Sequence, residues 1–288
     1  MLATLITGLA IGSIYAVIAV GYNLTWLTSR VINFAYAAFV VTGMFFTVWL
    51  YGLGLSFPLI LLILVGIGAL VALAEYLVAI LPLRNRGDHA ELVTTVGVTT
   101  ILQGLIFLTK APDGQRVPSV LPTGLVELFD GSRMGWAEIL VIAVTVVVAL
   151  GAHLWTTRTR TGLAALAQSE DQDAALVLGV RPQRIAIIMF VVSGSLGFVV
   201  APFIGAMTFA VVALAITLAV KGVVVLALGG IGSQLGALVA GLFLGIVEAL
   251  VLRFTDAVYQ NLVIYLIFIF ALLVRPQGLF GAVRAREV

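Results

Sequence analysis

Residues 161–184 read TGLAALAQSEDQDAALVLGVRPQR, a short polar stretch between two long apolar ones. Ser169 and Gln172 form a capping-box pattern, which predicts a helix start at which the serine side chain accepts a hydrogen bond from a first-turn amide. Glu170 and Asp171 would then lie at the positive end of the helix dipole. The pattern therefore predicts a helix that begins at Ser169.

The same stretch carries a helix stop and a second start. Gly179 accepts the left-handed conformation in which many helices end, and Pro182 suits a first helical turn, where its missing N–H costs nothing. We predict a short polar helix within residues 161–182, followed at once by a long apolar one. A polar element between segments that dissolve in lipid indicates a partner outside the membrane.

The composition places the chain among membrane proteins. Of its 288 residues 62% are hydrophobic and 10% are charged, and the mean hydropathy is +1.22. These values lie well outside the range of soluble domains. The absence of cysteine excludes disulfides and thiolate metal sites. The net charge of +2 indicates no nucleic-acid partner, because basic residues in such a chain mark membrane topology.

Apolar runs long enough to cross a bilayer, which takes about 20 residues each, recur along the whole sequence. We predict an all-α fold, a polytopic transmembrane bundle of about eight or nine spans, and one transmembrane domain over residues 1–288. Polar residues between 24 and 34 leave two alternatives, a cytoplasmic turn or an irregular break at membrane depth, and the second would change the number of spans. The predicted segments are 3–28, 34–53, 57–82, 91–109, 136–156, 184–208, 210–230, 234–252 and 257–274.

Basic residues divide unequally between the two sides if these segments alternate. By the positive-inside rule the richer side is cytoplasmic, so residues 157–184 lie in the cytoplasm and the loop 110–135 lies outside. The cytoplasmic set is Arg84, Arg86, Arg158, Arg160, Arg181, Arg184, Arg275, Arg284 and Arg286. The outer set is Lys110, Arg116, Arg133 and Arg253.

Ionisable side chains within apolar segments are costly at bilayer depth and are expected to have a partner or a function. Glu75 and Glu248 lie near segment ends, where snorkelling or a structural ion pair would explain them. Lys221 lies near the middle of its segment and either pairs with another helix or lines a pathway. Small residues four apart, which predict close helix packing, occur at Gly8/Gly12, Ser193/Gly197 and Gly241/Gly245.

No catalytic pattern is present in the sequence. The two histidines, His89 and His153, are far apart and form no metal motif. There is no G-x-x-x-x-G-K-[ST] loop, so the chain cannot bind ATP in the P-loop manner. We therefore expect no enzyme, no metal and no cofactor on this chain. An ion-driven transporter would need more intramembrane carboxylates, and a channel would need a polar ring, so the ionisable residues favour neither of these alternatives.

Several stretches of the chain, in their order, resemble one family. Any one of them is weak evidence, but together they cover essentially the whole chain. They are similar to the permeases of ABC importers for branched-chain amino acids and related solutes, the LivH/LivM family, and most of all to LivH. The stretches are GSIYAVIAVGYNLTW (12–26), VINFAYAAF (31–39), the polar stretch 161–184, KGVVVLALGGIGSQLGALVAGLFLGIVEAL (221–250) and LVRPQGLFG (273–281).

The resemblance implies a set of partners. In such importers two cytoplasmic ABC ATPase subunits hold ATP and Mg and dock on a short helix of the permease. An extracytoplasmic binding protein delivers the solute, and a second permease subunit, LivM-like or a second copy, completes the path through the bacterial cytoplasmic (inner) membrane. The residues that match the docking helix are Ser169, Glu170, Asp171, Ala174, Ala175 and Gly179.

The resemblance also implies a translocation path, which passes an irregular region near Asn33 and a glycine-rich segment near Gly229. Broken helices at membrane depth make backbone polar groups available to a solute. The residues that we assign to the path are Asn33, Phe34, Tyr36, Lys221, Gly229, Gly230 and Gly232.

The sequence departs from the family along this path. Family members commonly read N-F-A-H-G, whereas Tyr36 and Ala37 follow Ala35 here. The change favours a more apolar or aromatic acid as the solute, unless Tyr36 simply packs in the core. Arg30, just upstream, is either a partner for an anionic group of the solute or a charge at the cytoplasmic end of its span.

Overall fold

The computed structural model describes residues 1–83, 90–109, 114–119, 124–127 and 133–281, and most of these residues are helical. The long helices are α1 (Leu2–Ser29), α2 (Ala35–Gly52), α3 (Phe57–Glu75), α4 (Ala90–Leu108), α5 (Trp136–Arg158), α8 (Pro182–Met207), α9 (Leu214–Gly229), α10 (Gln234–Phe254) and α11 (Ala257–Val274). The short elements are the π-helical turn η1 (Tyr76–Ile80), the 3-10 turn η2 (Leu81–Leu83), α6 (Arg160–Glu170), α7 (Gln172–Val177), and the antiparallel strands β1 (Leu125–Glu127) and β2 (Arg133–Gly135).

Each of the nine predicted apolar segments corresponds to one long helix, so the prediction of an all-α polytopic bundle is confirmed. Among the described residues, seven helices are long and apolar enough to cross a membrane. Two more apolar helices, Leu214–Gly229 and Val258–Val274, are shorter. The agreement has a physical cause, since a backbone surrounded by lipid must satisfy its hydrogen bonds within its own segment.

The predicted interruption between residues 24 and 34 is narrower than the sequence indicates. α1 continues without a break to Ser29, and the hydroxyls of Thr25, Thr28 and Ser29 are satisfied inside the helix by donating to carbonyls three or four residues earlier. Only residues 30–34 are irregular, and we call them the elbow. The elbow touches the end of α6, so it is a turn at one end of the bundle and not a break within it.

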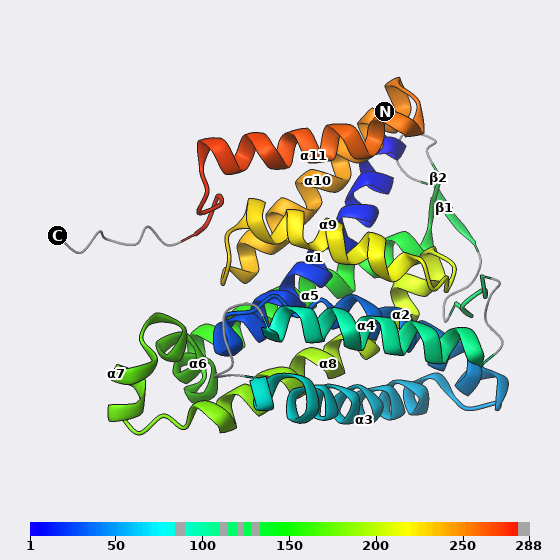
Figure 1. Ribbon diagram of the computed structural model, residues 1–288. Coiled ribbons are helices and arrows are strands. Elements are labelled where there is room, and N and C mark those ends of the chain that lie inside the picture. Colours follow the sequence, from blue (N-terminus) through cyan, green and yellow to red (C-terminus); the bar gives the residue numbers. More distant parts are fainter. Residues whose placement is uncertain (84–89, 110–113, 120–123, 128–132, 282–288) are drawn as a thin grey trace.

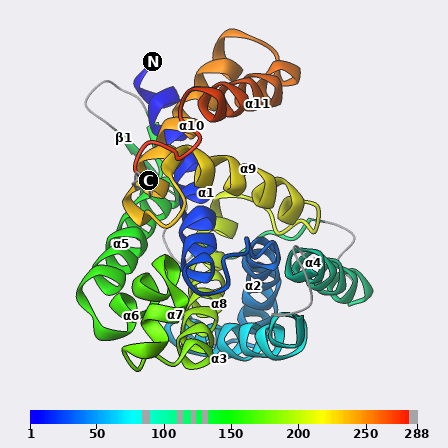
Figure 2. The same cartoon turned by 60° about the vertical axis from the view of Figure 1, so that its left-hand side comes forward.

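Helix α1 runs through the middle of the bundle and packs most closely on α10 (Figure 1, Figure 2). The predicted glycine pairs make this contact: a Cβ at Gly8 or Gly12 would collide with the backbone around Gly241 and Gly245. In lipid no hydrophobic effect drives two apolar helices together, so their association depends on van der Waals contact. Small residues allow the two backbones to come close enough for that contact. The prediction of close packing at these glycines is confirmed.

The two ends of the bundle differ in kind. In Figure 1 α6 and α7 lie at the lower left and β1 and β2 at the opposite side, and we call these the α6–α7 end and the β1–β2 end. The predicted outer loop 110–135 is described only at residues 114–119, 124–127 and 133–135. Several residues used above lie outside the described residues, namely Arg84, Arg86, His89, Lys110, Arg284 and Arg286.

Candidate functional site

The polar stretch between α5 and α8 forms two short helices instead of the single one predicted. α6 runs from Arg160 to Glu170, and the side chain of Thr159 caps its start by accepting from the Gly162 amide. α7 follows after one extended residue, Asp171, which has φ −144° and ψ 110°. The sharp change of direction between the two helices is visible at the lower left of Figure 1.

The predicted capping box is wrong, because Asp171 and not Ser169 caps the second helix. The Asp171 carboxylate accepts from the Asp173 and Ala174 amides at 2.9 and 3.0 Å. Ser169 instead lies in the last turn of α6, where its hydroxyl donates to the Leu166 carbonyl at 2.7 Å. A carboxylate at this place holds two amides and adds a negative charge at the helix N-terminus, which a serine cannot do.

The predicted end of the polar stretch is confirmed. Gly179 has φ +85°, and the Val180 amide donates to the Ala175 carbonyl at 3.0 Å, which closes α7 in the manner of a Schellman cap. Pro182 is the first residue of α8, as predicted. The two caps define both ends of α7, which is a separate helix between α6 and α8.

α7 is exposed over almost its whole length. Ala175 is buried, whereas Ala174 is exposed and the side chains of Val177 and Leu178 are 88% and 81% exposed. Asp171 and Asp173 are exposed beside them. Aliphatic side chains rimmed by charge on a polar helix are typical of a surface that binds another protein.

The elbow joins the α6–α7 end to α3 and α4. The Arg30 side chain donates to the Ser169 carbonyl and, at 3.1 Å, to the Glu170 carbonyl. Asn33 is buried, and its amide donates to the Glu75 carboxylate at 2.9 Å. The predicted path residues Asn33 and Phe34 are therefore held in a polar contact with the end of α3 and, through the Phe34 amide and Thr95, with α4.

The glycine-rich turn between α9 and α10 is a tightly bonded structure. Gly230 and Gly232 have φ of +99° and +88°, which only glycine adopts readily. Asn23 of α1, which is fully buried, accepts from the Gly232 amide at 2.6 Å and donates to the Ser233 carbonyl at 2.9 Å. The contact of Asn23 with this turn was not predictable, because nothing in one sequence links Asn23 to a turn more than 200 residues away.

The C-terminal stretch 273–281 packs on this turn. The Leu279 amide donates to the Leu228 carbonyl at 2.8 Å, and the Phe280 amide donates to the Gly229 carbonyl at 3.1 Å. The last carbonyls of α9 thus find partners outside their helix. Two of the sequence stretches that carried the family resemblance, 221–250 and 273–281, therefore form one structural unit.

Lys221 pairs with another helix, one of its two predicted alternatives. Its ammonium group lies 2.6 Å from the Glu248 carboxylate of α10 and 2.9 Å from the Tyr15 hydroxyl of α1. Gln260 of α11 also donates to Glu248. Four helices meet at this pair, and both charges are buried. The ion-pair alternative for Glu248 is likewise confirmed, with Lys221 as the partner; Arg253 binds Thr4 instead.

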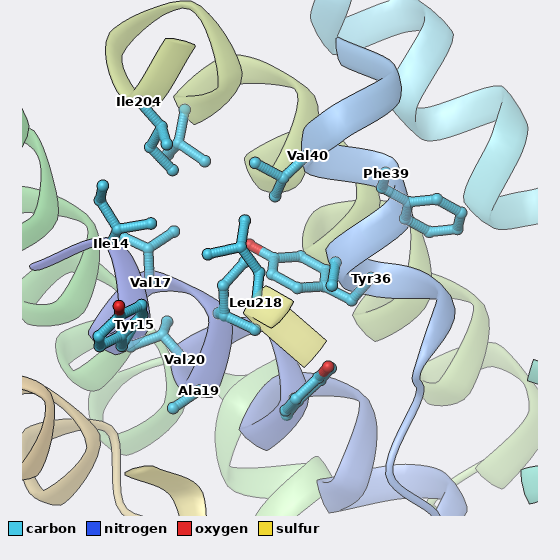
Figure 3. Close-up of a cluster of buried hydrophobic side chains, with 14 of the residues drawn as sticks. Ile14, Tyr15, Val17, Ala19, Val20, Tyr36, Phe39, Val40, Ile204 and Leu218 are labelled. Atoms are coloured by element: carbon cyan, nitrogen blue, oxygen red, sulfur yellow. The ribbon is translucent and has the colours of Figure 1, made fainter. Parts of the chain in front are cut away.

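Tyr36 lies in the buried apolar cluster, in the region of Leu218 and Val40 (Figure 3). Its ring packs edge-on against Tyr22 with 6.1 Å between ring centroids. Its hydroxyl has no hydrogen-bond partner among the described residues. The structure therefore gives Tyr36 a packing role, with a hydroxyl that is buried and has no partner among the described residues.

A cavity of about 700 Å³ lies between α2, α3 and α4, in the half of α2 away from the elbow. Its walls are almost wholly apolar, and the hydroxyl of Thr42, which lines it, has no hydrogen-bond partner among the described residues. Nearer the elbow, the stretch Ala35–Val41 of α2 is buried throughout. The cavity was not predicted, because it depends on how three helices diverge. Its lining residues are Thr42, Phe45, Phe46, Val48, Trp49, Val71, Leu102, Leu105, Ile106, Thr109 and Gln115.

These features define a class of protein. The bundle has membrane-length apolar helices, an apolar cavity and a pair of short polar helices at one end. A helical membrane transport protein has these properties.

Comparison with known proteins identifies the family. Residues 4–272 match the family model described as branched-chain amino acid transport system / permease component, so the chain belongs to this family. BraD of Pseudomonas aeruginosa, a high-affinity branched-chain amino acid transport system permease protein, is 30% identical over 301 residues, which cover 100% of this chain and 98% of BraD. LivH of Escherichia coli is 28% identical over 100% of this chain and 97% of its own length.

A more distant relative has the name of the other permease type. LivM of Escherichia coli is 26% identical over 94% of this chain and 68% of LivM. No solved structure matches the chain. The predicted LivH-like identity is confirmed, and the chain is a permease subunit of an importer in the inner membrane, not an enzyme.

Proposed function

We propose that this chain is the permease subunit of an ATP-driven importer for branched-chain amino acids or related small organic solutes, such as aromatic or carboxylic acids. The single observation that carries the proposal is α7, a capped polar helix that exposes Val177, Leu178 and two carboxylates at one end of a lipid-soluble bundle. Such a surface fits a protein partner that pushes on the bundle.

The partners follow from this assignment. Two ABC ATPase subunits, which carry the ATP and Mg, would dock at the α6–α7 end, taken as cytoplasmic. An extracytoplasmic solute-binding protein would dock at the β1–β2 end, and a LivM-like permease or a second copy of this chain would lie beside it in the lipid. We propose no cofactor on this chain and no nucleic-acid partner. The proposed coupling residues are Ser169, Glu170, Asp171, Ala174, Ala175 and Gly179, of which Asp171 and Gly179 form the caps.

We further propose that the solute passes along α2. The apolar cavity lies beside one half of α2. The other half of α2, around Tyr36, is buried and tightly packed. The apolar lining fits the aliphatic or aromatic part of a small acid. Asn33, Phe34 and the turn at Gly229, Gly230 and Gly232 would form the far end of the path, and Lys221 would hold the surrounding helices through Glu248.

A transport assay separates this function from an ion-driven transporter. The complete importer, purified through a tag on this chain and placed in proteoliposomes, should take up radiolabelled leucine or phenylalanine only with ATP and a solute-loaded binding protein. Vanadate should stop the uptake and a protonophore should not. Uptake by this chain alone, driven by a proton or sodium gradient, would contradict the proposal.

A further inference from the structure

Arg30 ends α1 in a conformation that is unfavourable for an arginine. Its φ of 56° and ψ of 17° lie in the left-handed region, and it is the one non-glycine residue with positive φ among the described residues. A Cβ is disfavoured there, so glycine or asparagine is the usual residue at such a helix end. An arginine that keeps this strained turn points to a use for its side chain.

The Arg30 side chain binds the free end of α6. It donates to the carbonyls of Ser169 and Glu170, the last two residues of that helix. These carbonyls have no partner within α6, and a cation at a helix C-terminus also interacts favourably with the helix dipole. Arg30 thus ends its own helix with its backbone and caps another with its side chain.

Gln168 makes the reciprocal contact. Its side chain is buried, and its amide nitrogen donates to the carbonyl of Thr28, in the last turn of α1, at 3.1 Å. The C-terminal turns of α1 and α6 therefore exchange hydrogen bonds in both directions. Two contacts of opposite sense fix the distance between α6 and the elbow more firmly than one contact would.

Three residues further on, the elbow holds α3. The Asn33 side chain accepts from the Ala35 amide at 3.0 Å and donates to Glu75 at 2.9 Å, so it ties the start of α2 to the last residue of α3. Glu75 is followed at once by the π-helical turn η1. Such turns have a less regular hydrogen-bond ladder than an α-helix and often lie at functional positions.

We propose that Arg30 and Gln168 are positioning residues that carry a displacement of α6–α7 to the elbow and, through Asn33, to the end of α3 at η1. The inference rests on the proposed function, in which ATP-binding subunits move α7. It assigns the transmission to two named hydrogen-bonding side chains, and it predicts that their loss uncouples ATP hydrolysis from uptake without preventing assembly.

The first test uses Arg30→Gly, because glycine keeps the left-handed turn and removes only the side chain. In proteoliposomes that hold the complete importer, we expect at least a tenfold fall in leucine taken up per ATP hydrolysed, with co-purification of the ATP-binding subunits unchanged. Gln168→Met, which keeps the side-chain length, should reduce the same ratio independently. Arg184→Ala, which removes an exposed arginine near the same end, is the control and should leave the ratio within twofold of native.

The second test measures the motion itself. The chain has no native cysteine, so Leu77→Cys on η1 and Leu53→Cys beyond α2 supply two spin-label sites without further changes. The distance between the labels should change between the nucleotide-free and ATP-bound importer, and Arg30→Gly should abolish that change.

An uptake ratio within twofold of native in both Arg30→Gly and Gln168→Met, or a label distance that still responds to ATP in Arg30→Gly, would overturn the inference. If Arg30→Gly fails to assemble, the ratio in Gln168→Met decides. If the native chain itself co-purifies with no ATP-binding subunit, the proposed function fails and not this assignment of residues.

Discussion

Lys221 and Glu248 satisfy each other in a place where neither charge would be tolerated alone. Their buried contact of 2.6 Å joins α9 to α10, and Tyr15 and Gln260 complete the hydrogen bonding of the shared carboxylate oxygen. Removing one partner leaves a buried charge uncompensated, whereas removing both and keeping the volume is often tolerated. The pair is therefore expected to show strong energetic coupling.

A double-mutant cycle tests this coupling. Lys221→Met alone should destabilise the purified permease by about 3–5 kcal/mol, and Lys221→Met with Glu248→Leu should recover most of the loss. The measurement is thermal unfolding in nanodiscs, with Arg253→Ala, which breaks only the contact with Thr4, as the control. A double variant as unstable as the single one would show that the pair does not act as a unit.

Tyr36 has a hydroxyl that the folded chain leaves without a partner among the described residues. Tyr36→Phe removes this hydroxyl and keeps the ring, so the unfolding temperature should stay the same or rise, because an unsatisfied buried polar group costs about 1–3 kcal/mol. If the hydroxyl meets the solute during transport, the same variant should raise the KM of uptake severalfold, and Tyr36→His should change the order of preference among aliphatic and aromatic acids. Unchanged KM and preference in both variants would leave Tyr36 a packing residue only.

At the scale of the element, α7 depends on the residue that caps it. Asp171→Ala removes the acceptor of two amides and should destabilise α7 by about 1 kcal/mol, which is enough to fray a helix of six residues. Because a frayed helix transmits force poorly, ATP-driven uptake should fall severalfold.

Ser169→Ala is the matched variant, because the Ser169 hydroxyl bonds only within α6 and alanine keeps the backbone carbonyl through which Ser169 contacts Arg30. It should leave uptake near the native value, as measured with the same importer in proteoliposomes. A larger loss of uptake with Ser169→Ala than with Asp171→Ala would show that Ser169 is the cap, as the sequence indicates.

The elements themselves were predictable, and the contacts between them were not. The nine apolar segments became nine helices because lipid leaves a backbone no other way to satisfy its hydrogen bonds. The choice of Asp171 over Ser169 as the cap depends on tertiary contacts, since Arg30 takes the carbonyls at the end of α6 and fixes where that helix stops. The partnership of Asn23 with Ser233 likewise depends on α1 crossing α10, which no local pattern shows.

At the scale of the whole molecule, the topology depends on the excess of arginine at one end. Gln172 is exposed on α7. We expect Gln172→Cys to react with a membrane-impermeant maleimide only after the membrane is made leaky. Arg116→Cys, exposed at the β1–β2 end, should react in intact cells. The native chain, which has no cysteine, gives the background. The reverse pattern of labelling would invert the orientation and remove α7 from the reach of cytoplasmic ATPases.

We propose that ATP-binding subunits dock on α7 and on Leu178, which follows it. A photo-crosslinking amino acid at Leu178, which is 81% exposed, tests it most directly in whole cells. The same probe at Leu53, 58% exposed near the end of α2 opposite the elbow, is the matched control. We expect the probe at Leu178, but not the probe at Leu53, to capture an ATP-binding subunit. Transport-competent cells in which Leu178 captures no ATP-binding subunit would contradict it.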